Sequence, residues 1–478
     1  MQLPARPRLT SVRPTRLSVS ILLSAIILAV SASVSLSLGS APLHTADETG
    51  HFDYAYEVWH LRLPDFYSGV LIRPSWAVVP PVQWESQHPP LFYVLLAPVI
   101  GPLADDGHAY LAVIAGRAMN SLLAGLAVFA VWWSVRRVLP RRSFAADMAA
   151  VVASLTSLVI LIGGTVYSDL ACLVCGAFAF GLCGALAREG RSWGLIFGAA
   201  GVSALGMLSR LSFAVWLIVL LVAVLLAENR RTGFRRLLMA TGDALIVGGS
   251  ALAFAGWFYV RNLLVAGSIT GGHSDWSSEH LGRTSATWIE VIFGSKFWIG
   301  VFAIFNGHLS RTDFGPWLLL LVPLMAAALA WSISASARRN APSRGTLKIV
   351  GLSLLEVVLT CLFLIWAETG GGGANNRYAL PLLPILAAMF GYVFSTGRVV
   401  GAAAATAWSC CEFAIDVGMV NLEEPITHVW ALVLARMAIV LAAVALIAAL
   451  ALMWVVRYRS SKRVAARHIL RRNLQPEY

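Results

Sequence analysis

The chain has 478 residues, of which 58% are hydrophobic and only 13% are charged. A soluble domain carries about 25% charged residues, so this composition excludes a soluble protein and predicts that most of the chain lies in a lipid bilayer. The formal net charge of +12 would fit a nucleic-acid partner. The distribution of the basic residues along the chain excludes that interpretation.

The apolar segments are long enough to cross a membrane many times. A crossing needs about 20 predominantly apolar residues, and about 12 such stretches follow one another along the chain, at 17–38, 109–135, 145–166, 168–187, 193–209, 211–227, 237–260, 315–335, 348–368, 378–395, 398–418 and 429–456. We expect 17–38 to be a crossing and not a cleavable signal. The stretch 89–104 is shorter and begins at Pro89-Pro90, which predicts a helix lying in the interface.

Basic residues gather on one side when alternate loops are assigned to the two faces. That side holds the amino terminus, the tail 457–478 and several short loops, including Arg136-Arg137 and Arg230-Arg231. The positive-inside rule places it in the cytoplasm, with both termini there, as an even number of crossings requires. This charge sets topology and meets anionic lipid, so we expect a membrane lipid partner and no nucleic acid.

Two long loops lie on the opposite, outer face, at 39–108 and 261–314, with a shorter one at 370–377. Both long loops are rich in Trp and Tyr, which settle at the headgroup level, so we expect interfacial helices within them. No internal repeat is visible. The sequence therefore predicts one polytopic, all-α membrane domain over 1–478, and loops of that length often carry function.

Acidic residues are concentrated on the outer face, most densely in the first loop. Asp47 and Glu48 follow the first crossing within about ten residues. A carboxylate at the edge of a low-dielectric helix bundle has its pKa raised toward neutrality and is well placed to act as a general base. A solvated loop acid is the simpler interpretation of either residue taken alone.

Several short motifs surround this acidic pair. They are Ala46-Asp47-Glu48-Thr49-Gly50-His51-Phe52-Asp53-Tyr54, Glu85-Ser86-Gln87-His88-Pro89-Pro90-Leu91-Phe92-Tyr93, Tyr167-Ser168-Asp169, Trp257-Phe258-Tyr259-Val260-Arg261-Asn262 and Asn376-Arg377-Tyr378-Ala379-Leu380-Pro381-Leu382-Leu383-Pro384. In this order and on this face, they resemble the GT-C superfamily of polytopic glycosyltransferases, of the protein-mannosyltransferase and aminoarabinose-transferase type. One departure is Ser209-Arg210, where many relatives have Thr-Lys, because arginine binds phosphate as a planar fork.

The resemblance implies transfer of a sugar, with inversion, from a polyprenyl-phosphate carrier to an acceptor on the outer face. Asp47 is then the predicted base, with Glu48 as its neighbour or replacement, and Asp169 orients the acceptor or assists a metal. Arg377, Arg261 and Arg210 are candidates to hold the phosphate through charge-assisted bonds, together with His88 and Tyr378. The sugar and the acceptor, which is a glycan, lipid or protein, cannot be read from the residues.

The sequence leaves a divalent metal ion open. His273, Asp275, Glu279 and His280 cluster in the second outer loop, although their spacing matches no rigid metal motif. The Cys172-x-x-Cys175 pair lies inside an apolar stretch, where a free cysteine usually behaves as a small buried hydrophobe.

Two other membrane functions compete with this interpretation. A transporter or flippase of a lipid-linked sugar is favoured by charged residues within predicted crossings, namely Asp243, Glu356, Glu412 and Arg436. A ligase or polymerase of lipid-linked glycans is also multispanning, but such enzymes generally lack an acidic pair after the first helix. The high alanine and arginine content favours a bacterial inner membrane.

Overall fold

The computed structural model describes residues 14–228, 232–295, 297–298, 303–306, 343–372, 375–395, 399–421 and 429–473 of the 478-residue chain. These residues form helices and no strands. The elements in chain order are α1 (Arg16–Gly39), α2 (Ala46–Trp59), η1 (Trp84–Gln87), α3 (Leu91–Asp105), α4 (Ala109–Val138), α5 (Ser143–Ser154), α6 (Ser157–Gly163), α7 (Asp169–Glu189), α8 (Trp193–Ser209), η2 (Leu211–Phe213), α9 (Ala214–Leu226), α10 (Gly233–Ala266), α11 (Ser274–Leu281), α12 (Trp288–Phe293), η3 (Ala303–Asn306), α15 (Arg344–Thr369), η5 (Asn376–Leu382), α16 (Leu383–Phe394), α17 (Val399–Asn421) and α18 (Val429–Asn473).

Seven of the described helices are long and apolar enough to cross a membrane, and the bent pair α5 and α6 makes an eighth candidate. The chain is therefore an all-α integral membrane protein, as the composition predicted. Eleven of the predicted crossings coincide with described helices, and the remaining one, 315–335, lies outside the described residues. The number of crossings itself stays a prediction.

The crossing predicted over 145–166 coincides with two helices rather than one, because the chain bends by 56° between α5 and α6. Hydroxyl groups explain the break locally. The side chain of Thr156 donates to the carbonyl of Val152, and that of Ser154 donates to the carbonyl of Val151. Such bonds compete with the helical backbone ladder and bend helices.

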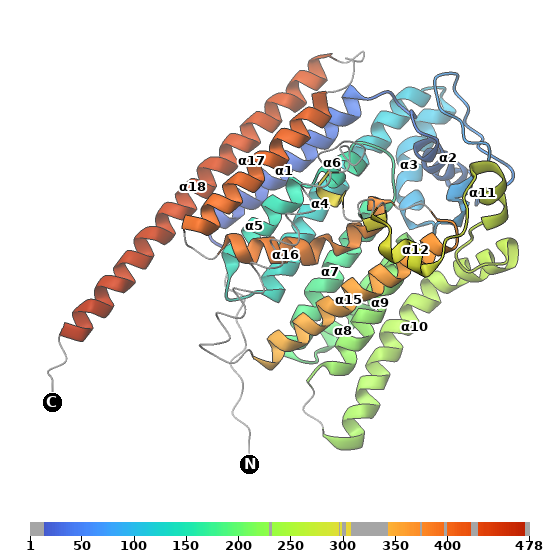
Figure 1. The fold of residues 1–478 in the computed structure, drawn as a ribbon. Helices are drawn as coiled ribbons and strands as arrows, with labels where there is room; N and C mark the ends of the chain where they lie inside the picture. Colours follow the sequence, from blue (N-terminus) through green and yellow to red (C-terminus); the bar gives the residue numbers. More distant parts are fainter. Residues whose placement is uncertain are drawn as a thin grey trace.

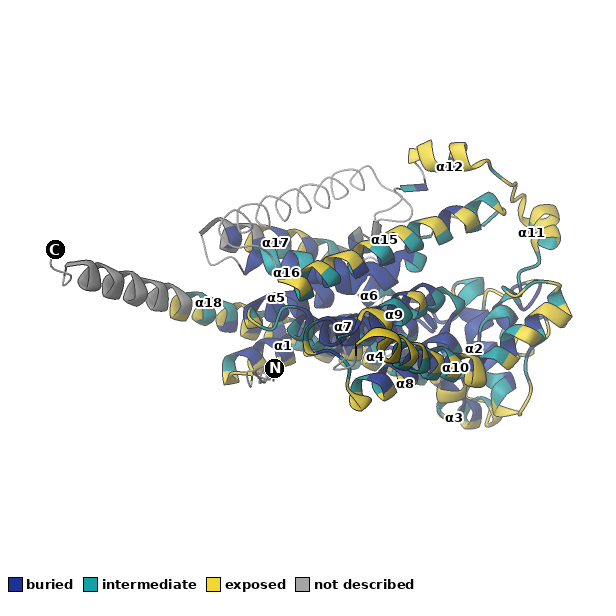
Figure 2. Cartoon of the chain, turned by 90° about the horizontal axis from the view of Figure 1, so that it is seen from below, coloured by how far each residue is buried: buried dark blue, intermediate teal, exposed yellow. Residues whose placement is uncertain are grey.

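The helices α1, α4 and α7 form the centre of the bundle (Figure 1). In α7, most of the apolar window is buried against neighbouring helices, and small residues allow this close packing. A Cβ added at Gly184 would lie 2.8 Å from a methyl group of Val138 on α4. Figure 2 shows buried residues along α7, α4 and α1, whereas α10, α11 and α12 carry many exposed ones.

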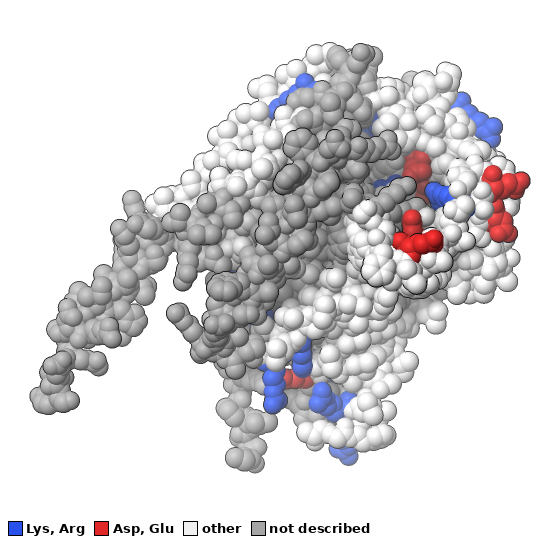
Figure 3. Space-filling view, viewed as in Figure 1, with Lys and Arg blue, Asp and Glu red and all other residues white. Residues whose placement is uncertain are grey.

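The first outer loop folds into a cap of short helices at one end of the bundle, where α2 and α3 pack on each other (Figure 1). A Cβ at Gly101 of α3 would collide with the ring of Trp59 on α2 at 2.2 Å, so this contact requires glycine. Acidic atoms on the visible face gather mainly near the cap, whereas basic atoms lie both beside the cap and at the opposite end (Figure 3). The assignment of the two ends to the outer and cytoplasmic faces stays a prediction.

Candidate active site

The helix α2 places the acidic pair in its first turn. The hydroxyl of Thr45 accepts from the backbone N–H of Glu48 at 3.2 Å and so caps the helix. Acidic residues are favoured at this end because the helix dipole is positive there. Neighbouring helical residues point in directions that differ by about 100°, so Asp47 and Glu48 face different surroundings.

Glu48 faces the protein interior and is fully buried. Both of its carboxylate oxygens accept from Arg117 of α4, at 2.7 and 2.8 Å, and Val166 N–H donates to it at 3.1 Å. Arg117 also donates to the backbone carbonyls of Ser37, Ser40 and Ala41. These contacts hold the carboxylate of Glu48 inside the protein, which favours Asp47 over Glu48 as the candidate base. The role of Glu48 as a replacement base stays a prediction.

Asp47 faces away from this interior, and its side chain is 35% exposed. The guanidinium of Arg377, in the first turn of η5, donates to its Oδ2 at 2.6 Å. These residues are separated by 330 positions in the chain. The ion pair therefore joins the first outer loop to the last outer turn, and leaves the carboxylate accessible.

A second acid–arginine pair lies deeper. Arg210, at the junction of α8 and η2, is 2.7 Å from Oδ1 of Asp169, the first residue of α7, and donates to the hydroxyl of Ser168 at 3.1 Å. Both side chains of the pair are less than one tenth exposed. The other oxygen of Asp169, Oδ2, is buried and has no hydrogen-bond partner within the described residues, so it is free to accept from a ligand.

Two tyrosine rings line the arginines. The guanidinium of Arg377 lies 4.6 Å from the ring centre of Tyr167, and that of Arg210 lies 5.8 Å from the ring centre of Tyr378. Cation–π contacts of this kind orient the planar groups without using their N–H donors. Both arginines therefore retain donors for an anion.

A third acid, Glu85, lies beneath these pairs. Its Oε2 is 3.0 Å from Nε2 of His88 and 3.4 Å from Nε2 of His51. Burial raises the pKa of Glu85 to about 8, and the negative charge of Asp47 adds to the rise. Burial also lowers the pKa of His88 well below its usual range, with a smaller contribution from Arg210, whose NH2 lies 3.5 Å from Nε2 of His88.

The backbone around Glu85 is fixed against α2. A Cβ at Gly50 would lie 3.0 Å from Cγ of Glu85, so a larger residue there would push against the Glu85 side chain. Gln83 donates to the carbonyl of Gly50 and to Oδ2 of Asp53, at 3.1 and 2.8 Å. Asp53 also accepts from the backbone N–H of Leu71 at 2.7 Å. Asp53 thus serves the loop structure and not the site.

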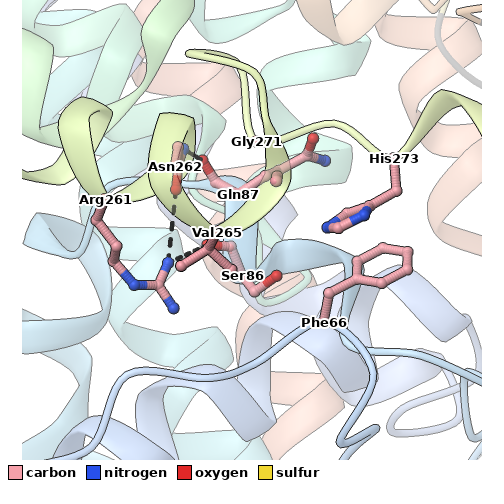
Figure 4. A pocket seen from close by; sticks show the side chains of 9 residues that line it. Phe66, Ser86, Gln87, Arg261, Asn262, Val265, Gly271 and His273 are labelled. Carbon is pink, nitrogen blue, oxygen red and sulfur yellow. Dashed lines mark hydrogen bonds between the residues drawn. The ribbon is translucent and has the colours of Figure 1, made fainter.

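Arg261, predicted to hold phosphate, is used elsewhere. It donates to the backbone carbonyls of Pro64 and Ser86, at 2.6 and 3.3 Å. Figure 4 shows it beside Asn262, Ser86 and Gln87, in a small recess that Phe66 and His273 close on the other side. Arg261 therefore fastens the first outer loop to the outer end of α10, and its role in holding phosphate stays a prediction.

The candidate metal cluster in the second outer loop is not formed. His273 stacks on Phe66 with ring centres 3.8 Å apart, while His280 stacks on Trp276. In the described ranges, no three His, Cys, Asp or Glu side chains come close enough to hold a metal ion. The four predicted residues, which include Asp275 and Glu279, instead belong to an aromatic-rich surface. Cys172 and Cys175 are buried free cysteines.

The structure thus brings together Asp47, Asp169, Arg210, Arg377 and His88, with Tyr378 at the edge. It separates Glu48, Arg261 and the four residues of the second loop from them. Sequence reasoning missed the roles of Glu85, His51 and Arg117. Arg117 carried a usable signal, since an arginine within an apolar stretch requires a partner, and Glu85 stands three residues before His88.

No family model and no curated protein matches this chain. Among solved structures, it resembles the oligosaccharyltransferase AglB from Archaeoglobus fulgidus, in complex with an inhibitory peptide and a dolichol-phosphate, at 12% identity and a TM-score of 0.48, over 85% of this chain and 56% of that chain. It also resembles ArnT from Cupriavidus metallidurans bound to undecaprenyl phosphate, at 12% identity and a TM-score of 0.46, over 96% of this chain and 81% of that chain.

The first of these is an oligosaccharyltransferase, and both structures are described with a polyprenyl-type lipid phosphate. This chain spans a little more than half the length of the AglB chain. With TM-scores below 0.5, the overlaps do not by themselves assign a function, so a functional conclusion has to rest on the residues of the site.

Proposed function

We propose that this protein is a membrane glycosyltransferase, which moves a sugar from a polyprenyl-phosphate carrier to an acceptor on the outer face of the membrane. The single observation that supports this most is the pairing of two acids with two arginines at the outer end of the bundle. Asp47 pairs with Arg377 and Asp169 pairs with Arg210. The acids are placed to act on an acceptor, and the arginines on a phosphate.

The arrangement suits a lipid-linked phosphate. Arg210, Arg377 and His88 come from three separate segments and converge beside helices that are long and apolar enough to cross the membrane. A guanidinium binds phosphate through parallel charge-assisted hydrogen bonds. A phosphate held there leaves its lipid tail free to extend along the bundle into the bilayer.

Asp47 is the proposed base. It is the most exposed acid of the site, and its ion pair with Arg377 orients the carboxylate. It accepts the proton of the acceptor hydroxyl while the oxygen attacks the anomeric carbon. The bond from that carbon to the phosphate oxygen then breaks, and its electron pair leaves with the polyprenyl phosphate. A single displacement of this kind inverts the anomeric carbon.

The arginines stabilise the leaving phosphate, and the second acid orients a reactant. The departing phosphate gains one negative charge, which Arg210 and Arg377 stabilise. The unpartnered Oδ2 of Asp169 accepts from a second hydroxyl of the acceptor or sugar and so orients it. The proposed setting is a bacterial inner membrane with both termini in the cytoplasm, and the acceptor is a glycan, a lipid or a protein.

The experiment that tests this proposal uses membranes containing the protein, a panel of radiolabelled polyprenyl-phosphate sugars and a host membrane extract as acceptor. The wild type is expected to transfer label from one donor and to release free polyprenyl phosphate in equal amount. Asp47→Asn should lose transfer, while the control Asp106→Asn, which changes an exposed acid of the same loop, should retain it. Transfer by Asp47→Asn at the wild-type rate would exclude Asp47 as the base.

A transporter or flippase is the second candidate, and one observation favours it. A cavity of about 320 Å³ lies between α1, α6, α17 and α18, lined mainly by apolar side chains together with Asp416 and Arg436. It adjoins the bend between α5 and α6 at Leu155, and broken helices with charged residues are typical of transporters. Asp243, by contrast, pairs with Arg191 at 2.6 Å. Movement of a labelled donor across vesicles without release of polyprenyl phosphate would select this function.

A further inference from the structure

Glu85 is a buried acid in the middle of the site that the proposed chemistry does not use. Its side chain is 6% exposed. Apart from the imidazole nitrogens of His88 and His51, its Oε2 has no hydrogen-bond partner in the part of the chain that the structure describes. A buried carboxylate without a cationic partner is costly, so the protonation of this group has consequences for whatever binds beside it.

The histidines around Glu85 form a connected network. His51 Nδ1 lies 2.7 Å from the hydroxyl of Tyr93 on α3, and the rings of His51 and His88 are stacked with centres 5.9 Å apart. His88 in turn reaches Arg210 at 3.5 Å. Both histidines have pKa values well below the usual range because burial disfavours their charged forms. They are therefore neutral, and neither neutralises a carboxylate at position 85.

Four charged groups from different elements act on Glu85. These are Asp47 on α2, Asp169 on α7, Arg210 between α8 and η2, and Arg377 on η5. The two acids and the two arginines cancel in pairs, so the site is neutral when Glu85 is protonated. A bound sugar phosphodiester then brings the net charge to −1, and an ionised Glu85 would bring it to −2 in a largely buried volume.

We propose that Glu85 is a positioning residue of this site: as a neutral acid hydrogen-bonded to His88 it allows an anionic phosphate to bind beside Arg210, and as a carboxylate it excludes that phosphate. In the neutral state the O–H of Glu85 donates to Nε2 of His88. In the ionised state the carboxylate is attracted to Arg210 and remains in contact with His88, so it competes with the phosphate for the positive charge of Arg210. This inference rests on the proposed function and adds the regulation of donor binding by pH.

The sign of the effect follows from the raised pKa. Glu85 holds its proton below about pH 8 and loses it above, so donor affinity is full at neutral pH and falls as the pH rises through 8. If the ionised form does not bind donor, affinity at pH 9.5 is about 30-fold below its plateau, because each pH unit beyond the pKa reduces the neutral fraction about tenfold.

The test measures binding of undecaprenyl methyl phosphate, a phosphodiester whose charge stays constant between pH 6.5 and 9.5, to the purified full-length protein in detergent micelles. The wild type should show the alkaline loss of affinity. Glu85→Gln, which mimics the neutral acid, should bind as the wild type does at pH 6.5 and should lose the pH dependence. The matched control is Glu57→Gln, because Glu57 is another buried acid of the same region, with its pKa raised to about 7 by burial and by Asp53. That variant should keep the wild-type profile.

Each outcome bears on a separate statement. A wild-type profile that stays flat, or a Glu85→Gln profile that still falls above pH 8, would overturn the role of Glu85 while leaving the proposed function intact. Failure of the wild type to bind the probe at any pH would overturn both. If the thermal midpoint shows that Glu85→Gln is not folded, Glu85→Asp takes its place. This variant retains a titrating carboxyl, but at a different position. Its affinity for the probe should still fall at alkaline pH, with the pH of half-maximal affinity shifted from that of the wild type. An unshifted pH of half-maximal affinity would refute the proposal.

Discussion

Replacing Glu48 by glutamine tests whether this residue stabilises the fold or takes part in the reaction. The substitution keeps the size of the side chain but removes its charge, which leaves the guanidinium of Arg117 buried without a counter-ion. Arg117 is fully buried and makes six hydrogen bonds, two of them to the Glu48 carboxylate. We therefore expect Glu48→Gln to destabilise the whole outer end of the bundle.

The magnitude follows from the burial of the pair. Removing one partner of a buried ion pair costs about 3–5 kcal/mol, since the remaining charge is left uncompensated. Whole domains are stabilised by only about 5–15 kcal/mol, so the loss should be visible as a large fall in thermal midpoint and in protein yield. The double variant Glu48→Gln/Arg117→Met removes the orphaned charge as well, and should recover part of the loss.

The assay follows tryptophan emission of the purified protein during heating, for the wild type, both single variants, the double variant and Asp106→Asn. The coupling between positions 48 and 117 is read from the cycle of single and double variants. Asp106→Asn should melt with the wild type. A Glu48→Gln protein that melts at the wild-type temperature yet transfers no sugar would refute the reasoning and return Glu48 to the chemistry.

Three further predictions concern the site and its supports. Arg377→Gln and Arg210→Gln should each weaken binding of undecaprenyl phosphate about 10- to 100-fold, because each removes charge-assisted hydrogen bonds to the phosphate; unchanged affinity in both would place the phosphate elsewhere. Arg261→Gln should lower the free energy of unfolding by about 1–2 kcal/mol and speed proteolysis within 60–88, while the affinity for phosphate is retained. A loss of affinity as large as in Arg377→Gln would contradict the role of Arg261 in attaching the first outer loop to α10. The double variant His273→Ala/His280→Ala should leave any stimulation of transfer by divalent ions unchanged, and loss of that stimulation would place an ion at α11.

Much of the helical architecture could be predicted because the bilayer imposes it. About 20 apolar residues are needed for each crossing, and this requirement leaves a signal that a single sequence displays. The bend between α5 and α6 could not be predicted in this way, because 145–166 is apolar enough overall to be identified as a crossing despite its hydroxyl residues at 154, 156 and 157. Its cause lies in the hydroxyl groups of Ser154 and Thr156, whose bonding to the helix backbone is seen only in three dimensions.

The site could be predicted as a set of residues but not as a geometry. Asp47 and Glu48 both carry a carboxylate and are adjacent in the sequence. The orientation of α2 about its axis decides which of them faces Arg117. The partners Asp47 and Arg377 lie 330 residues apart, beyond any local pattern. Arg261 and Arg377 were equally good candidates in the sequence, and only their contacts in three dimensions distinguish them: Arg261 binds the carbonyls of Pro64 and Ser86, whereas Arg377 binds Asp47.

The measurement that bears most directly on the proposed chemistry is the single-turnover rate of Asp47→Asn with saturating polyprenyl-phosphate sugar and acceptor. Loss of a general base typically slows the chemical step by about 10²- to 10⁴-fold, and donor binding should persist because Arg377 is no longer neutralised by the carboxylate. The proposed mechanism predicts this slow step in a protein that melts as the wild type does and still binds donor. A single-turnover rate equal to that of the wild type would contradict it.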